Sequence, residues 1–142
     1  MKATDVIRRD HEAAKALFEK YQKANQEDHA AMEEKIFKAL DTHEKMEDTY
    51  FYPALEETLN EDAALADLER EQGELETEVA GIKAMNGDKS EALKAAMDNV
   101  LAHAKKEEAE ILPKAEQTLS AEKLEELGAQ MEPQSAVAND KG

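Results

Sequence analysis

Apolar side chains recur three and four residues apart along four stretches of the chain. This spacing places them on one face of an α-helix, where they can pack against neighbouring helices. The expected inward positions are Ile7, His11, Ala14, Phe18 and Tyr21 in the first stretch; Met32, Ile36, Leu40, His43, Glu47 and Tyr50 in the second; Leu65, Leu68, Gln72, Leu75, Val79 and Ile82 in the third; and Leu93, Met97, Val100, His103, Glu107 and Ile111 in the fourth. No strand-like alternation competes with this pattern, so we expect an all-helical protein.

Turn and capping residues divide the four stretches into elements. Pro53 is expected to bend the second helix, because proline lacks the backbone N–H that an α-helix needs there. The expected boundaries are Thr4 for the start of the first helix, Asn25 or Asp28 for the start of the second and Leu59 for its end, Asn60 as the cap of the third, an Asp88 and Glu91 capping box for the fourth, and Ser120 and Gly128 for a short fifth. Long helices with short connections predict an all-α, antiparallel up-down-up-down four-helix bundle with a short C-terminal fifth helix. This bundle is expected to span residues 1–131, and residues 132–142 are expected to form a disordered tail.

Acidic residues outnumber basic ones by 34 to 18, which gives the 142-residue chain a formal net charge of −16. Such a surface repels phosphate backbones and anionic lipids, so we expect neither a nucleic acid nor a membrane as a partner. The absence of cysteine excludes disulfides and thiolate metal ligands. With no signal-peptide pattern and no apolar run long enough to span a bilayer, we expect a soluble, cytoplasmic protein.

The second and fourth helices contain the same passage. From His43 the chain reads HEKMEDTYFYPALEETL, and from His103 it reads HAKKEEAEILPKAEQTL, with seven identities in seventeen positions. The centre of the repeat is His-x-x-x-Glu. Residues four apart lie about 40° apart around a helix and one turn along it, so the imidazole and the carboxylate can point at a common centre. Two helices that face each other would present the same pair of side chains.

These repeated pairs lie on the apolar face of their helices, where an unpartnered carboxylate is strongly disfavoured. Hydrogen bonds between the histidines and the glutamates could satisfy them without a metal ion. His11 adds a third imidazole in phase with Ile7 and Phe18. Three imidazoles and two carboxylates that converge favour a metal site, and donors without sulfur suit iron, manganese or zinc. Carboxylates that can bridge two cations favour a dinuclear site over a single tetrahedral zinc.

His29 and Glu33 have the same spacing but lack the rest of the repeat. They lie about 21 Å along the helix from His43, at 1.5 Å per residue. We interpret them as surface or bundle-end residues. Tyr21 and Tyr50 lie in register with the inward positions, and we interpret them as core aromatics in preference to hydrogen-bond donors to the site.

A single histidine on the first helix and His-x-x-x-Glu on the second and fourth make the chain resemble the hemerythrin-like, or HHE cation-binding, family. The proline ten residues after each motif histidine is also similar to that family. The resemblance implies two iron ions, Fe2+ or Fe3+, bridged by oxygen or hydroxide. It implies His11, His43 and His103 as iron ligands, with Glu47 and Glu107 as bridges between the ions.

The third helix departs from the family pattern, which usually has at least one histidine there. The corresponding stretch reads REQGELETEV, with Gln72 at the inward position and Glu76 one turn further on. Two interpretations are open. Gln72 is a core residue that hydrogen-bonds to its neighbours, or a side chain of this helix, Glu76 or Gln72, replaces the missing imidazole as a ligand. On the fourth helix, Glu107 has the spacing of the hemerythrin-like branch, and we prefer it to Glu108, the position that oxygen carriers use.

The resemblance implies a protein that binds or reacts with dioxygen or a related small ligand such as peroxide or nitric oxide. A carboxylate in place of an imidazole on the third helix would stabilise the ferric state, which disfavours reversible oxygen transport. A binding protein is favoured over an enzyme, and peroxide or nitric-oxide turnover remains open. The alternatives are storage or sensing of iron or another divalent metal without redox turnover, and a metal-free interaction bundle.

Overall fold

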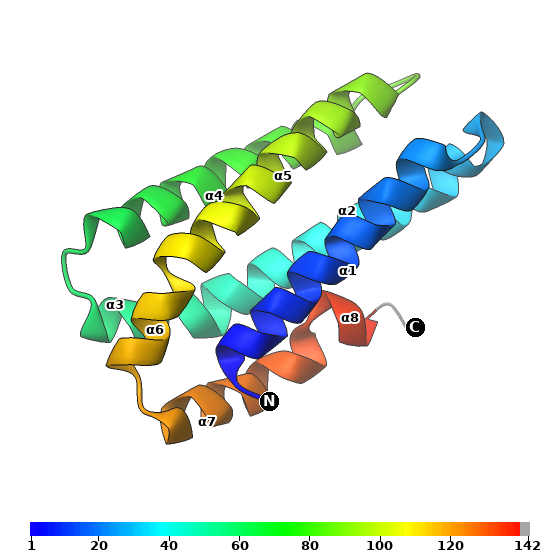
Figure 1. Cartoon of the computed structure of the whole chain (residues 1–142). Coiled ribbons are helices and arrows are strands. Elements are labelled where there is room, and N and C mark those ends of the chain that lie inside the picture. The colour runs from blue at the N-terminus through cyan, green and yellow to red at the C-terminus, as the bar shows by residue number, and fades with distance from the viewer. Residues whose placement is uncertain (140–142) are drawn as a thin grey trace.

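The computed structural model describes residues 1–139, which form helices and short turns without a strand (Figure 1). The long elements are α1 (Ala3–Lys23), α2 (His29–Met46), α4 (Ala63–Lys83) and α5 (Ser90–Glu110). The shorter elements are η1 (Gln26–Asp28), the π-helical η2 (Glu47–Phe51), α3 (Tyr52–Thr58), α6 (Leu112–Thr118), α7 (Ala121–Met131), η3 (Glu132–Gln134) and α8 (Ala136–Asn139). The all-helical class predicted from the periodicity is confirmed for these residues.

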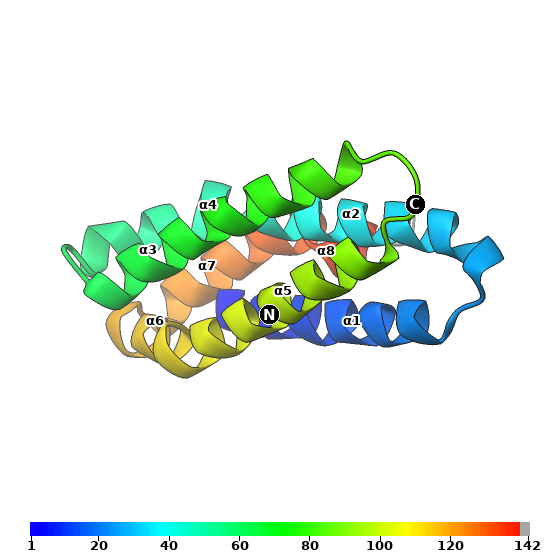
Figure 2. The same ribbon diagram turned by 90° about the horizontal axis from the view of Figure 1, so that it is seen from above.

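The long helices form a bundle in which α1 packs on α2 and α4 packs on α5, while α1 also contacts α5 and α2 contacts α4 (Figures 1 and 2). The expected inward positions of the third stretch are buried without exception: Leu65, Leu68, Gln72, Leu75, Val79 and Ile82. Helical periodicity is a local property, so the spacing alone was sufficient to find this face.

Two apolar clusters form the core. One includes Ile7 and Met46, and the other includes Phe18 and Leu40. His11 lies between Ile7 and Phe18 on α1, and His43 lies between Leu40 and Met46 on α2. The polar residues singled out by the sequence therefore interrupt the core between its two apolar clusters.

Each of the two motif helices is interrupted at its proline. Pro53 follows the π-helical segment η2, and Pro113 follows a break at Ile111 between α5 and α6. Both prolines lie in the first turn of the helix that follows, where a missing N–H is tolerated. The bend expected at Pro53 is thus accompanied by one wider, π-helical turn that begins at Glu47.

Two of the predicted helix caps differ in the structure. Asp62, and not Asn60, caps α4, because Glu61 takes a left-handed conformation (φ 62°) that turns the chain and lets the Asp62 carboxylate accept from the Leu65 N–H at 3.0 Å. The expected Asp88 and Glu91 capping box is absent: Asp88 Oδ1 instead accepts from the Ser90 N–H (2.9 Å) and hydroxyl (2.6 Å) in a local turn.

The short fifth helix is present as α7. Ser120 caps it by accepting from the Lys123 N–H at 3.0 Å, as predicted. The helix does not end at Gly128, as we expected, but continues to Met131. Gly128 packs against the backbone of Met1. A Cβ at Gly128 would lie 1.9 Å from the Met1 carbonyl oxygen, so only glycine allows this approach.

The C-terminal residues differ from the disordered tail that we expected over 132–142. Residues 132–139 form η3 and α8, which pack against α1 and α2 (Figures 1 and 2). Ser135 and Ala136 are buried there. Residues 140–142 lie outside the described part of the chain.

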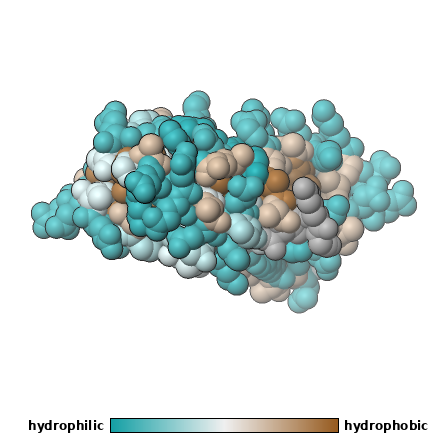
Figure 3. All heavy atoms as spheres, turned by 90° about the horizontal axis from the view of Figure 1, so that it is seen from below, coloured by the Kyte–Doolittle hydropathy of each residue, from teal (hydrophilic) through white to brown (hydrophobic). Residues whose placement is uncertain are grey.

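The surface that carries α7 and α8 is mostly hydrophilic, with small apolar areas between the charged side chains (Figure 3). Within residues 1–139, no helix combines the length and the apolar character that a membrane crossing requires.

Candidate metal centre

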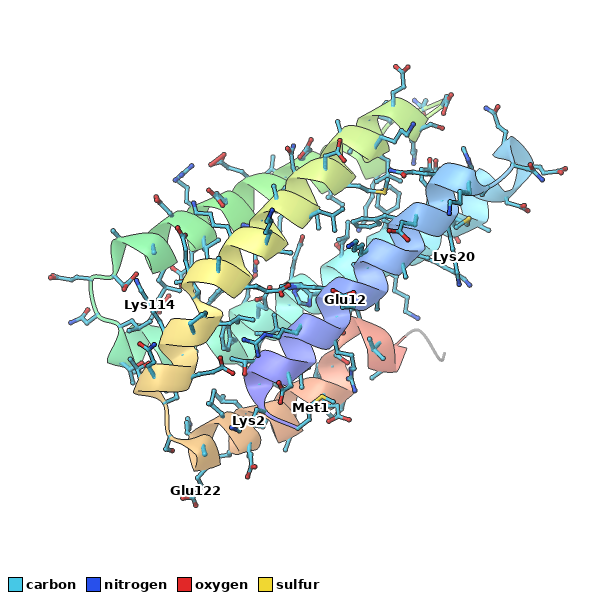
Figure 4. The ribbon with its side chains drawn as sticks, in the orientation of Figure 1. Met1, Lys2, Glu12, Lys20, Lys114 and Glu122 are labelled. Atoms are coloured by element: carbon cyan, nitrogen blue, oxygen red, sulfur yellow. The ribbon has the colours of Figure 1, made fainter. Side chains whose placement is uncertain are left out.

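Three side chains from three helices meet in the middle of the bundle. One ligand atom each of His11 on α1, His43 on α2 and Glu107 on α5 lie within 4.8 Å of one another. The two imidazole rings are 5.1 Å apart between centroids and tilted by 59°. Glu12, labelled in Figure 4, marks the turn of α1 that carries His11. Glu47 joins the group, because its Oε1 lies 2.9 Å from His43 Nε2.

Each of the three motif histidines is held at Nδ1 by a carboxylate outside the centre. The pairs are His43 with Asp10 (2.9 Å), His11 with Glu108 (2.7 Å) and His103 with Glu71 (3.2 Å). A carboxylate at Nδ1 leaves Nε2 as the nitrogen that faces the core. Metal-ligating histidines commonly have this arrangement, since the outer carboxylate fixes the ring orientation and raises the basicity of the ligand nitrogen.

The Nε2 atoms face buried acceptors or a cavity. His43 Nε2 lies 2.9 Å from Glu47 Oε1, and His11 Nε2 lies 3.1 Å from Glu107 Oε1. His103 Nε2 is buried without a hydrogen-bond partner among the described residues. His103 is not part of the tight group of three, but it lines the same cavity as His11 and His43.

The unsatisfied polar atoms of this region are a test of whether a metal ion fits. Besides His103 Nε2, Glu47 Oε2 and Glu107 Oε1 are buried and lack a hydrogen bond of acceptable geometry within residues 1–139. Each such atom costs about 1–3 kcal/mol if nothing satisfies it. One imidazole nitrogen and two carboxylate oxygens form a donor set that suits iron, manganese or zinc. The residues present therefore fit a metal ion.

The two buried glutamates have opposite protonation preferences. Burial, and then the charge of Glu107, raise the pKa of Glu47 well above its ordinary value. Burial also disfavours the charged form of Glu107, but the neighbouring side chains of Glu47 and His11 outweigh it and lower the pKa of Glu107. In the absence of a cation, a proton is therefore favoured on Glu47 over Glu107. A bound cation would replace this proton.

His43 lies between two buried carboxyl groups, those of Asp10 and Glu47. Burial disfavours its charged form, but Glu47 and Asp10 on its two sides raise the pKa of His43 well above 6.5. A cation at the centre would take over the role of this imidazolium, because both compensate the neighbouring carboxylates.

On the fourth long helix, Glu107 and Glu108 have different places. Glu107 is fully buried and lies beside His11 Nε2. The Glu108 side chain is 37% exposed and bonds the outer nitrogen of the same imidazole. Of these two carboxylates, Glu107 is therefore the one that faces the core.

The third long helix, α4, contributes no imidazole to the centre. Gln72 is buried, donates through Nε2 to Asp48 at 2.8 Å and has its Oε1 3.3 Å from the Tyr52 hydroxyl. It is thus a core residue that hydrogen-bonds to its neighbours, and it also lines the cavity beside the centre. Glu76 lies beside Asp48, and burial together with a hydrogen bond to Asp48 raises the pKa of Glu76 to about 7.

Tyr52 is a site residue that the sequence reasoning missed. Its hydroxyl donates to Glu107 Oε2 at 2.7 Å, and the residue is buried. In a regular α-helix, Tyr52 would point about 140° away from Glu47, five residues earlier. The π-helical turn brings it over Glu47 instead, since the Tyr52 N–H bonds to the Glu47 carbonyl. Tyr50, which we had considered, is partly buried and packs against the apolar core.

His29 and Glu33 lie away from the centre, at the start of α2. His29 Nε2 is 3.2 Å from the Ala24 carbonyl and its Nδ1 is 3.3 Å from the Ser90 hydroxyl. Glu33 accepts from the Tyr21 hydroxyl at 2.6 Å. Both residues form hydrogen bonds at the end of the bundle, as we predicted from the sequence.

A small cavity of about 40 Å³ adjoins the centre. The polar residues of its wall are Asp10, His11, His43, Glu44, Glu47, Gln72 and His103. The rest of the wall is apolar and includes Ala14, Leu40, Leu75, Val100 and Leu101. A cavity of this size holds a water molecule or a diatomic ligand, since one water needs about 10–15 Å³. The apolar wall favours a small, uncharged occupant.

Comparison with known families places these features in context. The model of the hemerythrin HHE cation-binding domain matches residues 2–115, which include the five predicted ligands and the motif helices. No curated protein and no solved structure matches the chain. Because the match covers most of the chain, this protein belongs to the hemerythrin HHE cation-binding domain family.

Proposed function

We propose that this chain is a non-haem di-iron protein. In this proposal His11, His43 and His103 bind iron through Nε2, and Glu47 and Glu107 bridge two ions within an antiparallel up-down-up-down bundle. One observation supports it most: His103 Nε2 is buried without a partner among the described residues, and His103 lines the same cavity as His11 and His43. A buried imidazole nitrogen held in place at its other nitrogen and left unsatisfied is otherwise costly.

Bound iron would supply one-electron chemistry toward dioxygen, peroxide or nitric oxide. The residues of the chain would set the conditions for it. The outer carboxylates Asp10, Glu71 and Glu108 hold the imidazoles in orientation. Tyr52 holds Glu107, and the apolar cavity restricts access to small ligands. Since α4 offers an amide and carboxylates but no imidazole, we expect reaction with the ligand in preference to reversible oxygen transport.

Metal content and spectrum test this proposal together. We expect about two iron ions per chain after anaerobic loading, and an absorption change when the ferrous protein meets dioxygen, peroxide or nitric oxide. His103→Ala should lower the iron content. His29→Ala is the matched control, because His29 lies at the bundle end. Equal iron loss in both variants, or no iron in the unmodified protein, would refute the proposal.

Storage or sensing of a divalent metal is the second candidate. The observation that favours it is the donor set itself, because imidazole and carboxylate without sulfur also suit manganese and zinc. Stoichiometric metal binding without any spectral response to the three small ligands would identify this function.

A further inference from the structure

The C-terminal segment, residues 132–139, reaches the metal centre through one carboxylate. Asp10 on α1 is almost completely buried and accepts three hydrogen bonds. Two come from the segment: the Ala136 N–H donates to Oδ2 at 3.0 Å and the Val137 N–H donates to Oδ1 at 3.1 Å. The third is with His43 Nδ1, 2.9 Å from Oδ2. One carboxylate thus connects the segment to a predicted ligand.

The segment is attached to α1 at further points. Arg9 donates to the Ser135 hydroxyl at 3.3 Å and lies 3.7 Å from Glu132 Oε1. Ser135 is fully buried, and Ala136 forms part of the cavity wall beside Asp10 and His43. The segment therefore both holds Asp10 and closes the cavity at this point.

The other two outer carboxylates lack such a cover. The side chains of Glu71 and Glu108 are 30% and 37% exposed, against 1% for Asp10. Glu71 also accepts from Lys106 Nζ at 2.8 Å, a partner that water can replace. Only Asp10, among these three, is kept in position by backbone donors from a separate part of the chain. His43 is thus the imidazole whose orientation depends on the C-terminus.

We propose that residues 132–139 are a positioning element for His43: their two backbone N–H groups hold Asp10 on His43 Nδ1, and so keep Nε2 directed at the metal centre. The expected consequence, tighter metal binding, rests on the proposed function. The orientation of His43 by Asp10 does not require a metal. Without the two donors, water would solvate Asp10, and its side chain could leave the imidazole. Loss of an outer partner of this kind typically lowers metal affinity by about 10–100-fold.

A substitution can remove one donor and keep the helix. Proline lacks the N–H but fits the first position of a helix, which Ala136 occupies, and the preceding Ser135 has the extended backbone (ψ 160°) that proline requires. Ala136→Pro therefore deletes the bond to Asp10 Oδ2. Ala136→Ser keeps the N–H and is the matched control. Val137→Pro removes the second donor, although it also disfavours the helical backbone of the preceding Ala136.

The first measurement uses the metal-free full-length protein. The Nδ1 proton of His43 should exchange slowly with water in the unmodified chain and in Ala136→Ser, and about ten-fold faster in either proline variant. The proton on His103 Nδ1, held by Glu71 on the other side of the bundle, should be unaffected in the same spectra. Circular dichroism should show a loss of total helix content no larger than the four residues of α8 can account for.

The second measurement is the rate of iron loss to a chelator, which we expect to rise about ten-fold in Ala136→Pro and not in Ala136→Ser. Unchanged proton exchange at His43 in both proline variants would overturn the proposal. So would faster exchange that affects His43 and His103 equally, since that indicates general loosening. If the unmodified protein binds no metal, the proposed function fails, and the exchange measurement still decides this inference.

Discussion

Tyr52 donates a 2.7 Å hydrogen bond to Glu107, across the core from the helix that carries Glu47. The two residues are 55 positions apart, and only the π-helical turn after Glu47 directs Tyr52 toward α5. Burial and the neighbouring carboxylates Glu47 and Glu107 raise the pKa of Tyr52, so its hydroxyl stays a donor. This bond keeps one oxygen of an ionised, buried carboxylate satisfied.

Tyr52→Phe should therefore destabilise the metal-free protein. Glu107 Oε2 would lose its donor on a side chain that is fully buried, and hydrogen bonds to charged groups contribute about 1.5–3 kcal/mol. Urea unfolding in the presence of a chelator measures the loss. Tyr50→Phe is the control, because Tyr50 packs against the apolar core by its ring. Equal stability of Tyr52→Phe and the unmodified protein would contradict the role given to this bond.

Glu47 and Glu107 should respond differently to removal of their charge. Burial favours the protonated form of Glu47, which Glu47→Gln imitates, so this substitution should change the unfolding free energy by less than about 1 kcal/mol. Glu107→Gln removes the ionised partner of Tyr52 and His11 and should cost about 2–3 kcal/mol.

Glu47→Gln and Glu107→Gln should weaken metal binding to a similar extent, although they differ in their effect on metal-free stability. Both substitutions replace a carboxylate that would bridge the ions, and each should weaken iron retention at least ten-fold. Chelator competition beside urea unfolding gives both quantities for each variant. A similar loss of metal-free stability in the two variants would show that the proton does not reside on Glu47.

The sequence predicted the part of the site that depends on helical spacing. His43 with Glu47, and His103 with Glu107, share a face because residues four apart always do in an α-helix. His11 fell on the same face as its apolar neighbours Ile7 and Phe18. These positions needed only the local period, and the structure places four of the five side chains in contact.

The remaining contacts depend on features without a local sequence signal. Tyr52 is out of register by α-helical spacing and becomes a neighbour of the centre through a π turn. Asp10 and Glu71 are two of many acidic residues, and only tertiary packing puts them on an imidazole. The C-terminal segment was missed because it binds Asp10 by backbone N–H groups, which every residue except proline has.

Stability of the metal-free protein should fall as pH rises from about 5 to about 8. Burial, and then the charges of Glu76 and Asp41, raise the pKa of Glu44 to about 8. In this range the unfolded chain has released the Glu44 proton and the folded chain retains it, so unfolding becomes more favourable as pH increases.

Glu44→Gln should weaken this dependence and raise the thermal midpoint near pH 8. Glu12→Gln, on the exposed side of α1, is the control and should leave the pH profile unchanged. Differential scanning calorimetry with chelator at several pH values measures both. Identical slopes for the unmodified protein and Glu44→Gln would exclude Glu44 as the group responsible.

Two glycine-to-alanine substitutions should have opposite effects on stability. At Gly128 in α7, the new Cβ would meet the Met1 carbonyl oxygen at 1.9 Å and the carbonyl carbons of Met1 and Lys2 at 2.9 Å, so α7 or the start of α1 must move. Such overpacking costs about 1–3 kcal/mol. At Gly73, exposed on α4, the Cβ would meet nothing within 4 Å. Alanine there should stabilise the helix by about 0.5–1 kcal/mol.

Urea unfolding of the two variants beside the unmodified chain gives the sign of each effect. Since both substitutions add one methyl group to a helical glycine, propensity alone would make both stabilising. A stabilised Gly128→Ala would therefore mean that α7 does not lie against the Met1 backbone. A destabilised Gly128→Ala with a stabilised Gly73→Ala isolates the contact between the N-terminus and α7 as the cause. That contact holds the N-terminal end of α1, the helix that carries both Asp10 and His11.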